Sequence, residues 1–208
     1  LLAAVLQGVL PLVGAQRNLP SLTAIARPAA WLQLVMVLGA FVVLTIAFVQ
    51  QDFSLRYVAD NSNTLLPVIY RYSAVWGSHE GSLLLWALVL ALWTAAVAAF
   101  SRHLPTVVVA RVLAVMGLVS VGFLAFLLFT SNPFERLFPV PLEGRDLNPL
   151  LQDPGLIIHP PMLYLGYVGF AVPFAFATAA LLDGHTDVRC RPWTRPWPTA
   201  PGAFLPLG

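Results

Sequence analysis

Two histidines next to polar motifs are the first candidates for chemistry in this sequence. His79 lies in the motif Trp76–Ser82, and His159 lies two residues before the end of the segment Gly144–Pro161. Both motifs interrupt long apolar runs. A neutral imidazole binds metal ions well, and haem iron commonly takes histidine as an axial ligand.

The residues after His159 are Pro160 and Pro161. Proline is favoured at the first position of a helix, because its missing amide needs no partner there. It also restricts the backbone of the residue before it. We therefore expect a helix that begins at Pro160 and holds His159 at its entrance, either as a ligand or as an interfacial histidine bonded to a loop carbonyl.

His79 precedes a long apolar run that begins at Ser82. Its position suits a ligand or a titrating group at a membrane surface. The alternative is a helix-start cluster, in which Ser78 caps the helix and Glu80 complements the positive end of the helix dipole. The residue types alone leave both interpretations open.

Arg145 lies among turn-forming residues and charges that we expect to fold back over the helix ends. A guanidinium binds carboxylates through two parallel hydrogen bonds, so Arg145 suits a carboxylate of a ligand. The alternative is an ion pair with Asp146 or Asp153 within the same loop.

The elements that must position these residues are transmembrane helices. The chain of 208 residues is 59% hydrophobic and only 10% charged, whereas a soluble domain carries about 25% charged residues. About 20 apolar residues span a bilayer. We predict an all-α polytopic transmembrane bundle with interfacial outer loops, about five spans and the start of a sixth, with spans at about 1–15, 29–49, 82–100, 112–130 and 160–182.

The distribution of arginine predicts the orientation of these spans. Loops alternate between a basic set, with seven arginines and two acids, and an acidic set, with four arginines and seven acids. Basic loops stay in the cytoplasm. The acidic loops 50–81 and 131–159, which carry both motifs, are therefore expected on the outer side.

Several segments also carry signals for local structure. The segments Leu65–Trp76 and Phe134–Pro141 are apolar and aromatic, and we expect each to form a short interfacial helix. In the last span, Gly166 and Gly169 permit close helix packing, and Pro173 predicts a kink.

Composition also argues against several other classes of function. The arginines form no basic stripe, which argues against nucleic-acid binding. The single cysteine, Cys190, excludes an intrachain disulfide and a cysteine metal cluster. The middle of each predicted span lacks ionisable residues, which weakens a transporter interpretation.

The motifs resemble those of one family over nearly the whole chain up to about Asp183. Trp76–Trp86, Thr130–Phe134 and Asp60–Thr64 are similar to segments of the CcmF haem lyase family of cytochrome c biogenesis. The run Gly144–Pro161, continued through Tyr164–Phe170, is similar to that family's signature almost without interruption.

The resemblance implies a multi-pass protein of the bacterial inner membrane with its motif loops in the periplasm. Such a protein takes haem b from a periplasmic haem chaperone and joins it to apocytochrome c, together with other subunits of the cytochrome c maturation complex. It implies that His159 is an axial ligand to haem iron. Arg145 would form an ion pair with a haem propionate or with a loop carboxylate. His79 would support the haem ligand without contacting the iron, or would have a structural role.

The resemblance leaves two further readings of function. A nitrite-reductase-specific haem lyase shares these motifs, and a haem exporter is another relative. Outside the family, the alternative is a membrane transporter or scaffold. The resemblance also implies that a Trp-rich motif and further histidine ligands follow beyond Gly208. We therefore expect residues 183–208 to be a cytoplasmic loop and the start of another span, and this portion alone to lack lyase activity.

Overall fold

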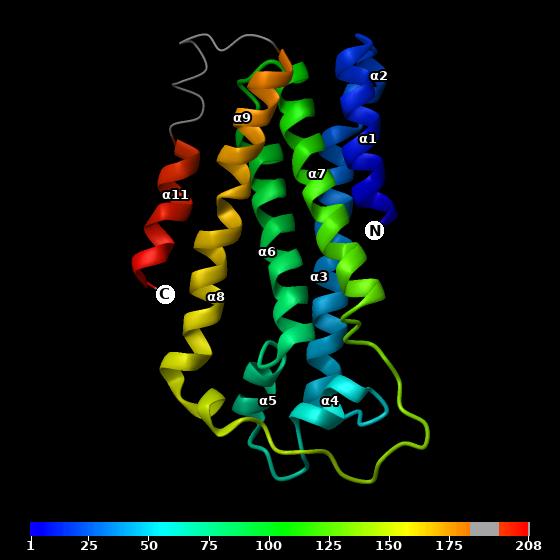
Figure 1. Cartoon of the computed structure of the whole chain (residues 1–208), viewed down its shortest axis with the longest axis vertical. Helices are drawn as coiled ribbons and strands as arrows, with labels where there is room; N and C mark the ends of the chain where they lie inside the picture. Colours follow the sequence, from blue (N-terminus) through cyan, green and yellow to red (C-terminus); the bar gives the residue numbers. More distant parts are fainter. Residues whose placement is uncertain (184–195, 208) are drawn as a thin grey trace.

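The computed structural model describes residues 1–183 and 196–207, and these residues form a bundle of helices that run along one long axis (Figure 1). Three helices are long: α3 (Ala26–Gln50), α6 (His79–Phe100) and α7 (Thr106–Phe129). The shorter elements are α1 (Leu2–Gln16), α2 (Pro20–Thr23), α4 (Arg56–Asn61), α5 (Val68–Ala74), η1 (Pro149–Gln152), α8 (Pro154–Gly169), α9 (Ala171–Asp183), α11 (Pro196–Phe204) and η3 (Leu205–Leu207).

Four helical stretches in the described residues are long and apolar enough to cross a membrane. They are Pro20–Gln50, His79–Phe100, Thr106–Phe129 and Pro154–Asp183. A helix rises about 1.5 Å per residue, so each can cross roughly 30 Å of hydrocarbon. The predicted all-α transmembrane bundle is confirmed.

The first and last predicted spans differ in detail from the helices observed. α1 has 15 residues and is shorter than a membrane-spanning helix. The last stretch starts at Pro154, not at Pro160, and is divided into α8 and α9 around Phe170. The break has a local cause, because Pro173 has no amide to donate to the carbonyl of Gly169.

The connections between the helices gather at the two ends of the bundle, in agreement with the alternation of basic and acidic loops. α2 and the α6–α7 connection lie at one end, and α4, α5 and residues 131–153 lie at the other (Figure 1). Both motifs with histidines therefore approach the same end. His185 and Cys190 lie outside the described residues.

Close contacts between glycines fix α1 against α7. A Cβ on Gly8 would lie 2.8 Å from the Leu118 side chain, and a Cβ on Gly117 would lie 2.8 Å from the Gly8 nitrogen. Gln7 is fully buried at this crossing and donates to the carbonyl of Leu113 at 2.7 Å. Small residues allow this approach in a lipid environment, where helix packing depends on close contact.

The segment 131–148 crosses the end of the bundle without forming a helix, so the predicted helix at Phe134–Pro141 is wrong. Pro139 and Pro141 lack amide donors, and the segment pairs with α4 instead. Arg56 donates its amide to the Glu135 carbonyl at 2.8 Å, and Leu137 donates to Ser54 at 2.8 Å. Helix α5, in contrast, confirms a short helix in the stretch Leu65–Trp76, although it begins only at Val68, after Pro67.

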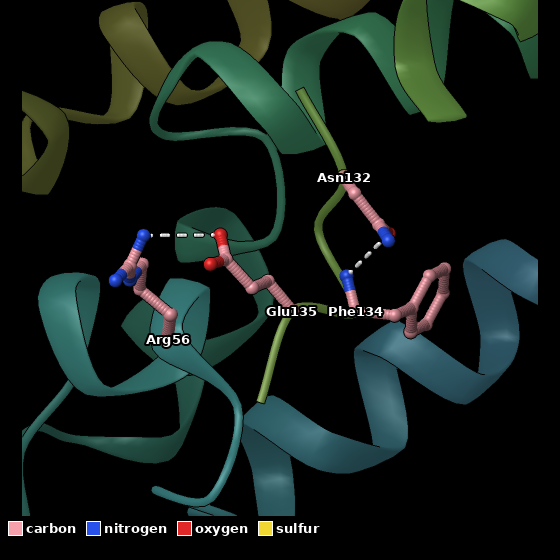
Figure 2. Close-up of polar contacts among 4 residues, drawn as sticks. All are labelled: Arg56, Asn132, Phe134 and Glu135. Atoms are coloured by element: carbon pink, nitrogen blue, oxygen red, sulfur yellow. Dashed lines mark hydrogen bonds and ion pairs between the residues drawn. The ribbon is translucent and has the colours of Figure 1, made fainter. Parts of the chain in front are cut away.

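An ion pair and an aromatic ring strengthen this attachment. Figure 2 shows Arg56 paired with Glu135 at 3.1 Å and the side chain of Asn132 accepting a hydrogen bond from the amide of Phe134. The Phe134 ring points toward α3 (Figure 2) and packs against a buried apolar cluster. The ion pair is exposed and contributes little by itself, so the buried ring and the backbone pairing hold the segment.

Candidate functional site

The two motifs that the sequence singled out contact each other at one end of the bundle. The indole N–H of Trp76 donates to the carbonyl of Ile157 at 3.2 Å. A Cβ on Gly77 would lie 2.9 Å from the Leu151 side chain and 3.3 Å from that of Leu147. Residues far apart in the sequence thus form one site around the start of α8.

Helix α4 holds the Trp76–Ser82 motif through Tyr57. Its buried hydroxyl accepts a hydrogen bond from the amide of Ser78 at 3.2 Å and lies 3.2 Å from the carbonyl of Val75. Burial raises the pKa of Tyr57, so the hydroxyl stays protonated at neutral pH and can donate to a carbonyl. Tyr57 was not predicted as a site residue, because its partners lie in another helix.

Helix α4 also holds the second motif. The amide of Arg145 donates to the carbonyl of Ala59 at 2.7 Å, and its guanidinium lies 3.6 Å from the Asp60 carboxylate. The expected ion pair with Asp146 or Asp153 is therefore replaced by one with Asp60. The Arg145 side chain is 82% exposed, so its guanidinium can also meet a carboxylate from outside.

His159 lies inside α8, not at its entrance as predicted. Asp153 starts this helix, and its carboxylate accepts hydrogen bonds from the amides of Gly155 at 2.8 Å and Leu156 at 3.3 Å. Capping by aspartate is strong enough to set a helix start ahead of a proline pair. His159 is exposed on the second turn of α8, near the start of that helix.

His79 is the first residue of α6 and contacts a different helix. Its Nδ1 lies 3.2 Å from the hydroxyl of Ser131, and its ring meets Phe126 edge-on at 6.1 Å between centroids. Glu80 lies in the first turn, as expected. Ser78 occupies the capping position, but its side chain caps no amide in the described residues, and its own amide donates to the Tyr57 hydroxyl.

Tryptophans of α6 join this helix to α8 within the bundle. The Trp93 indole donates to the carbonyl of Leu165 at 3.1 Å, and the Trp86 ring packs on Tyr164 at 5.4 Å. Gly169 lies beside Trp93 and Pro201 of α11, which confirms the close packing predicted for this glycine. The spacing of Trp86 and Trp93, seven residues apart on one helix face, is a sequence signal for this contact.

In the residues described, no three histidine, cysteine, aspartate or glutamate side chains gather as a metal site. A separate cavity of about 440 Å³ lies between α1, α3 and α7 and contains apolar side chains with Gln33 and Asn132. No histidine lines this cavity among the described residues, so it is separate from both motifs that carry histidines.

The model of the family described as cytochrome C assembly protein matches residues 76–199. The chain is 61% identical to the cytochrome c-type biogenesis protein CcmF of Pseudomonas aeruginosa over 99% of its length and 31% of the relative. It is 60% identical to CcmF of Escherichia coli K12, with 99% of the chain and 32% of the relative covered.

A solved structure agrees with the computed fold. The structure described as cytochrome c heme lyase CcmF matches 98% of this chain with a TM-score of 0.84 and 28% identity, and the match covers 32% of that protein. The chain therefore spans about a third of the length of the relatives it matches.

Proposed function

Since this chain belongs to the cytochrome c assembly protein family, we propose that it forms part of a cytochrome c haem lyase in a bacterial inner membrane. The proposed substrates are haem b, delivered by a periplasmic haem chaperone, and apocytochrome c. Other subunits of the maturation complex are the expected further partners. Residues 1–182 form the transmembrane region in this proposal, and residues 183–208 lead to the next span.

The proposal depends above all on the convergence of two motifs around one exposed imidazole. Trp76 and Gly77 contact the segment that leads to His159, and α4 ties both motifs together through Tyr57 and Arg145. This arrangement presents His159 at the end of the bundle where the longer loops lie. We assign His159 the role of an axial ligand to the iron of incoming haem.

The chemistry proposed for the whole lyase is an addition that needs no acid or base from this region. Each substrate thiol adds across a haem vinyl group: a carbon–sulfur bond forms, and the proton ends on the neighbouring vinyl carbon. His159 contributes by fixing the haem relative to the two thiols, because orientation alone raises the rate of such a reaction greatly. Arg145 is proposed to pair with a haem propionate, in exchange with Asp60.

His79 has a different role in this proposal. Its contacts with Ser131 and Phe126 tie α6 to the segment after α7. We propose that His79 supports the position of the Trp76–Ser82 motif and does not bind iron.

The ligand role is tested by replacing His159 with alanine in the full-length protein. We expect loss of covalent haem in c-type cytochromes, measured by haem stain, and loss of haem from the purified protein. His103→Ala is the matched control, because His103 is exposed in the α6–α7 connection at the opposite end. Normal maturation and normal haem loading in the His159→Ala variant would refute the ligand role.

The periplasmic position of the motif loops is tested separately. A reporter enzyme that is active only outside the cytoplasm is fused within the segment 131–148 or within the α6–α7 connection. We expect activity from the first fusion and none from the second. Absence of activity from the first fusion would contradict the proposed function, since the haem chaperone and apocytochrome are expected outside.

A further inference from the structure

The helix that carries His159 has a local defect in its hydrogen bonding. In an α-helix the amide of each residue bonds to the carbonyl four residues earlier. Pro160 and Pro161 lie inside α8 and have no amide, so the carbonyls of Leu156 and Ile157 lose their usual donors. These carbonyls lie two and three residues before His159, so the defect affects the turn that orients the imidazole.

The indole of Trp76 supplies the donor that Pro161 withdraws. Its N–H lies 3.2 Å from the Ile157 carbonyl, which would otherwise bond to the amide of residue 161. The bond is partly buried, so it competes with water less than an exposed bond would and favours one position of the turn. The contact comes from a separate element, the connection between α5 and α6.

Trp76 is itself fixed at several points. Its amide bonds to the Ser73 carbonyl at 3.3 Å, and its carbonyl accepts from the Ser82 hydroxyl at 2.8 Å. Its ring packs against both buried apolar clusters of the bundle. The indole donor is therefore held in place by contacts other than its hydrogen bond to α8.

Trp93 makes a similar bond with a different consequence. It donates to the carbonyl of Leu165, and the residue four positions later is Gly169, which has an amide. The Trp93 bond thus adds to helical bonding and replaces nothing. It also lies in a later turn of α8, away from His159.

We infer that Trp76 is a positioning residue for His159: its indole replaces the amide missing at Pro161 and fixes the turn of α8 that presents the imidazole to haem iron. This inference rests on the proposed role of His159 as an iron ligand. It assigns a task to the first residue of the Trp76–Ser82 motif, which does not itself touch the iron.

The test compares Trp76→Phe with Trp93→Phe in the full-length protein purified in detergent. Ferric protoporphyrin IX is titrated into each variant, and the binding constant and the spin state of the iron are recorded by absorption and electron paramagnetic resonance. We expect Trp76→Phe to weaken binding by about 2- to 10-fold, the range given by one lost hydrogen bond, and to raise the high-spin fraction. Trp93→Phe should leave the spin state unchanged.

The outcomes separate the inference from the proposed function. If His159→Ala binds ferric haem with the wild-type spectrum, the proposed function is wrong. If His159→Ala loses the low-spin signal while Trp76→Phe and Trp93→Phe both keep it, only the positioning role is wrong.

A second pair of variants covers the case in which Trp76→Phe is poorly folded. Replacing Trp76 with β-(3-benzothienyl)alanine keeps the shape of the ring and removes the N–H, and an unchanged spin state with this residue would overturn the inference. Pro161→Ala restores an amide opposite Ile157, so the effect of Trp76→Phe should shrink in that background. An undiminished effect would also overturn the inference.

Discussion

The substitution Gly81→Ala tests the packing that joins α4, α5 and α6. Gly81 lies in the first turn of α6, where its Cα is close to Val75, at the end of α5, and to Tyr57 of α4. A Cβ at this position would lie 2.5 Å from the Tyr57 hydroxyl and 2.8 Å from the Tyr57 ring, and would overlap the carbonyl oxygen of Val75. The Val75 backbone and the buried Tyr57 ring are both rigid, so neither can easily move aside for the added methyl group.

The magnitude follows from two opposing effects. Alanine is favoured over glycine within a helix by about 1 kcal/mol. Forcing a methyl group into a closely packed site costs about 1–3 kcal/mol and occasionally more, and the overlap with a backbone oxygen places Gly81 at the upper end. We therefore expect a net loss of about 2 kcal/mol or more, which for a domain of this size lowers the melting temperature by roughly 4–8 °C or more.

The assay is thermal unfolding of the purified protein in detergent, with Gly122→Ala as the control. A Cβ on Gly122, in the interior of α7, meets nothing within 4 Å, so this variant should be as stable as wild type or slightly more stable. If Gly81→Ala melts at or above the temperature of Gly122→Ala, the close approach of α6 to Tyr57 and Val75 is wrong.

Three further substitutions test other contacts by the same unfolding assay. Tyr57→Phe removes the oxygen that accepts the Ser78 amide and should cost about 1–3 kcal/mol; no change would contradict that bond. Gln7→Leu removes one buried hydrogen bond but also a buried amide oxygen that has no partner in the described residues, so stability should stay level or rise, and a large loss would contradict this balance. Hydrogen bonds from Thr64 lower the pKa of Glu143, so its contribution is present above the ordinary glutamate pKa and is lost as pH falls through the lowered value. Wild type should therefore lose more stability than Glu143→Gln between pH 7 and acid, and parallel loss would refute the assignment.

Local signals in the sequence were sufficient to predict the class of fold and to assign each connection to one of the two ends of the bundle. Runs of about 20 apolar residues predict membrane helices because lipid leaves the backbone few other ways to satisfy its polar groups. The alternation of arginine-rich and acidic loops predicted which connections share an end, and the helices bear this out. Glu80 in the first turn of α6 and the short helix at α5 were also correct, since each depends on neighbours within one turn.

One error was local, because the Asp153 carboxylate caps amides two and three residues later and starts α8 ahead of Pro160. Two others concern residues whose partners are distant in the sequence. Arg145 has nearby acids, yet it pairs with Asp60, because the fold brings α4 beneath the loop. The segment Phe134–Pro141 has an interfacial composition, yet it pairs with Ser54 and Arg56. Neither choice can be read from local composition, because the ion pair depends on which carboxylate the fold brings near Arg145, and the backbone pairing on which amides and carbonyls lie nearby without partners.

The sequence by itself determined that this is a membrane bundle with two motifs at one end, because apolar length and charge asymmetry are properties of the chain alone. Only the tertiary structure decided how the motifs meet. Trp76, in the connection between α5 and α6, donates to the carbonyl of Ile157 in α8, which Pro161 leaves without its usual donor. That outcome required two segments to be adjacent in space, since a missing backbone hydrogen bond can be filled only by a group that the fold brings within reach.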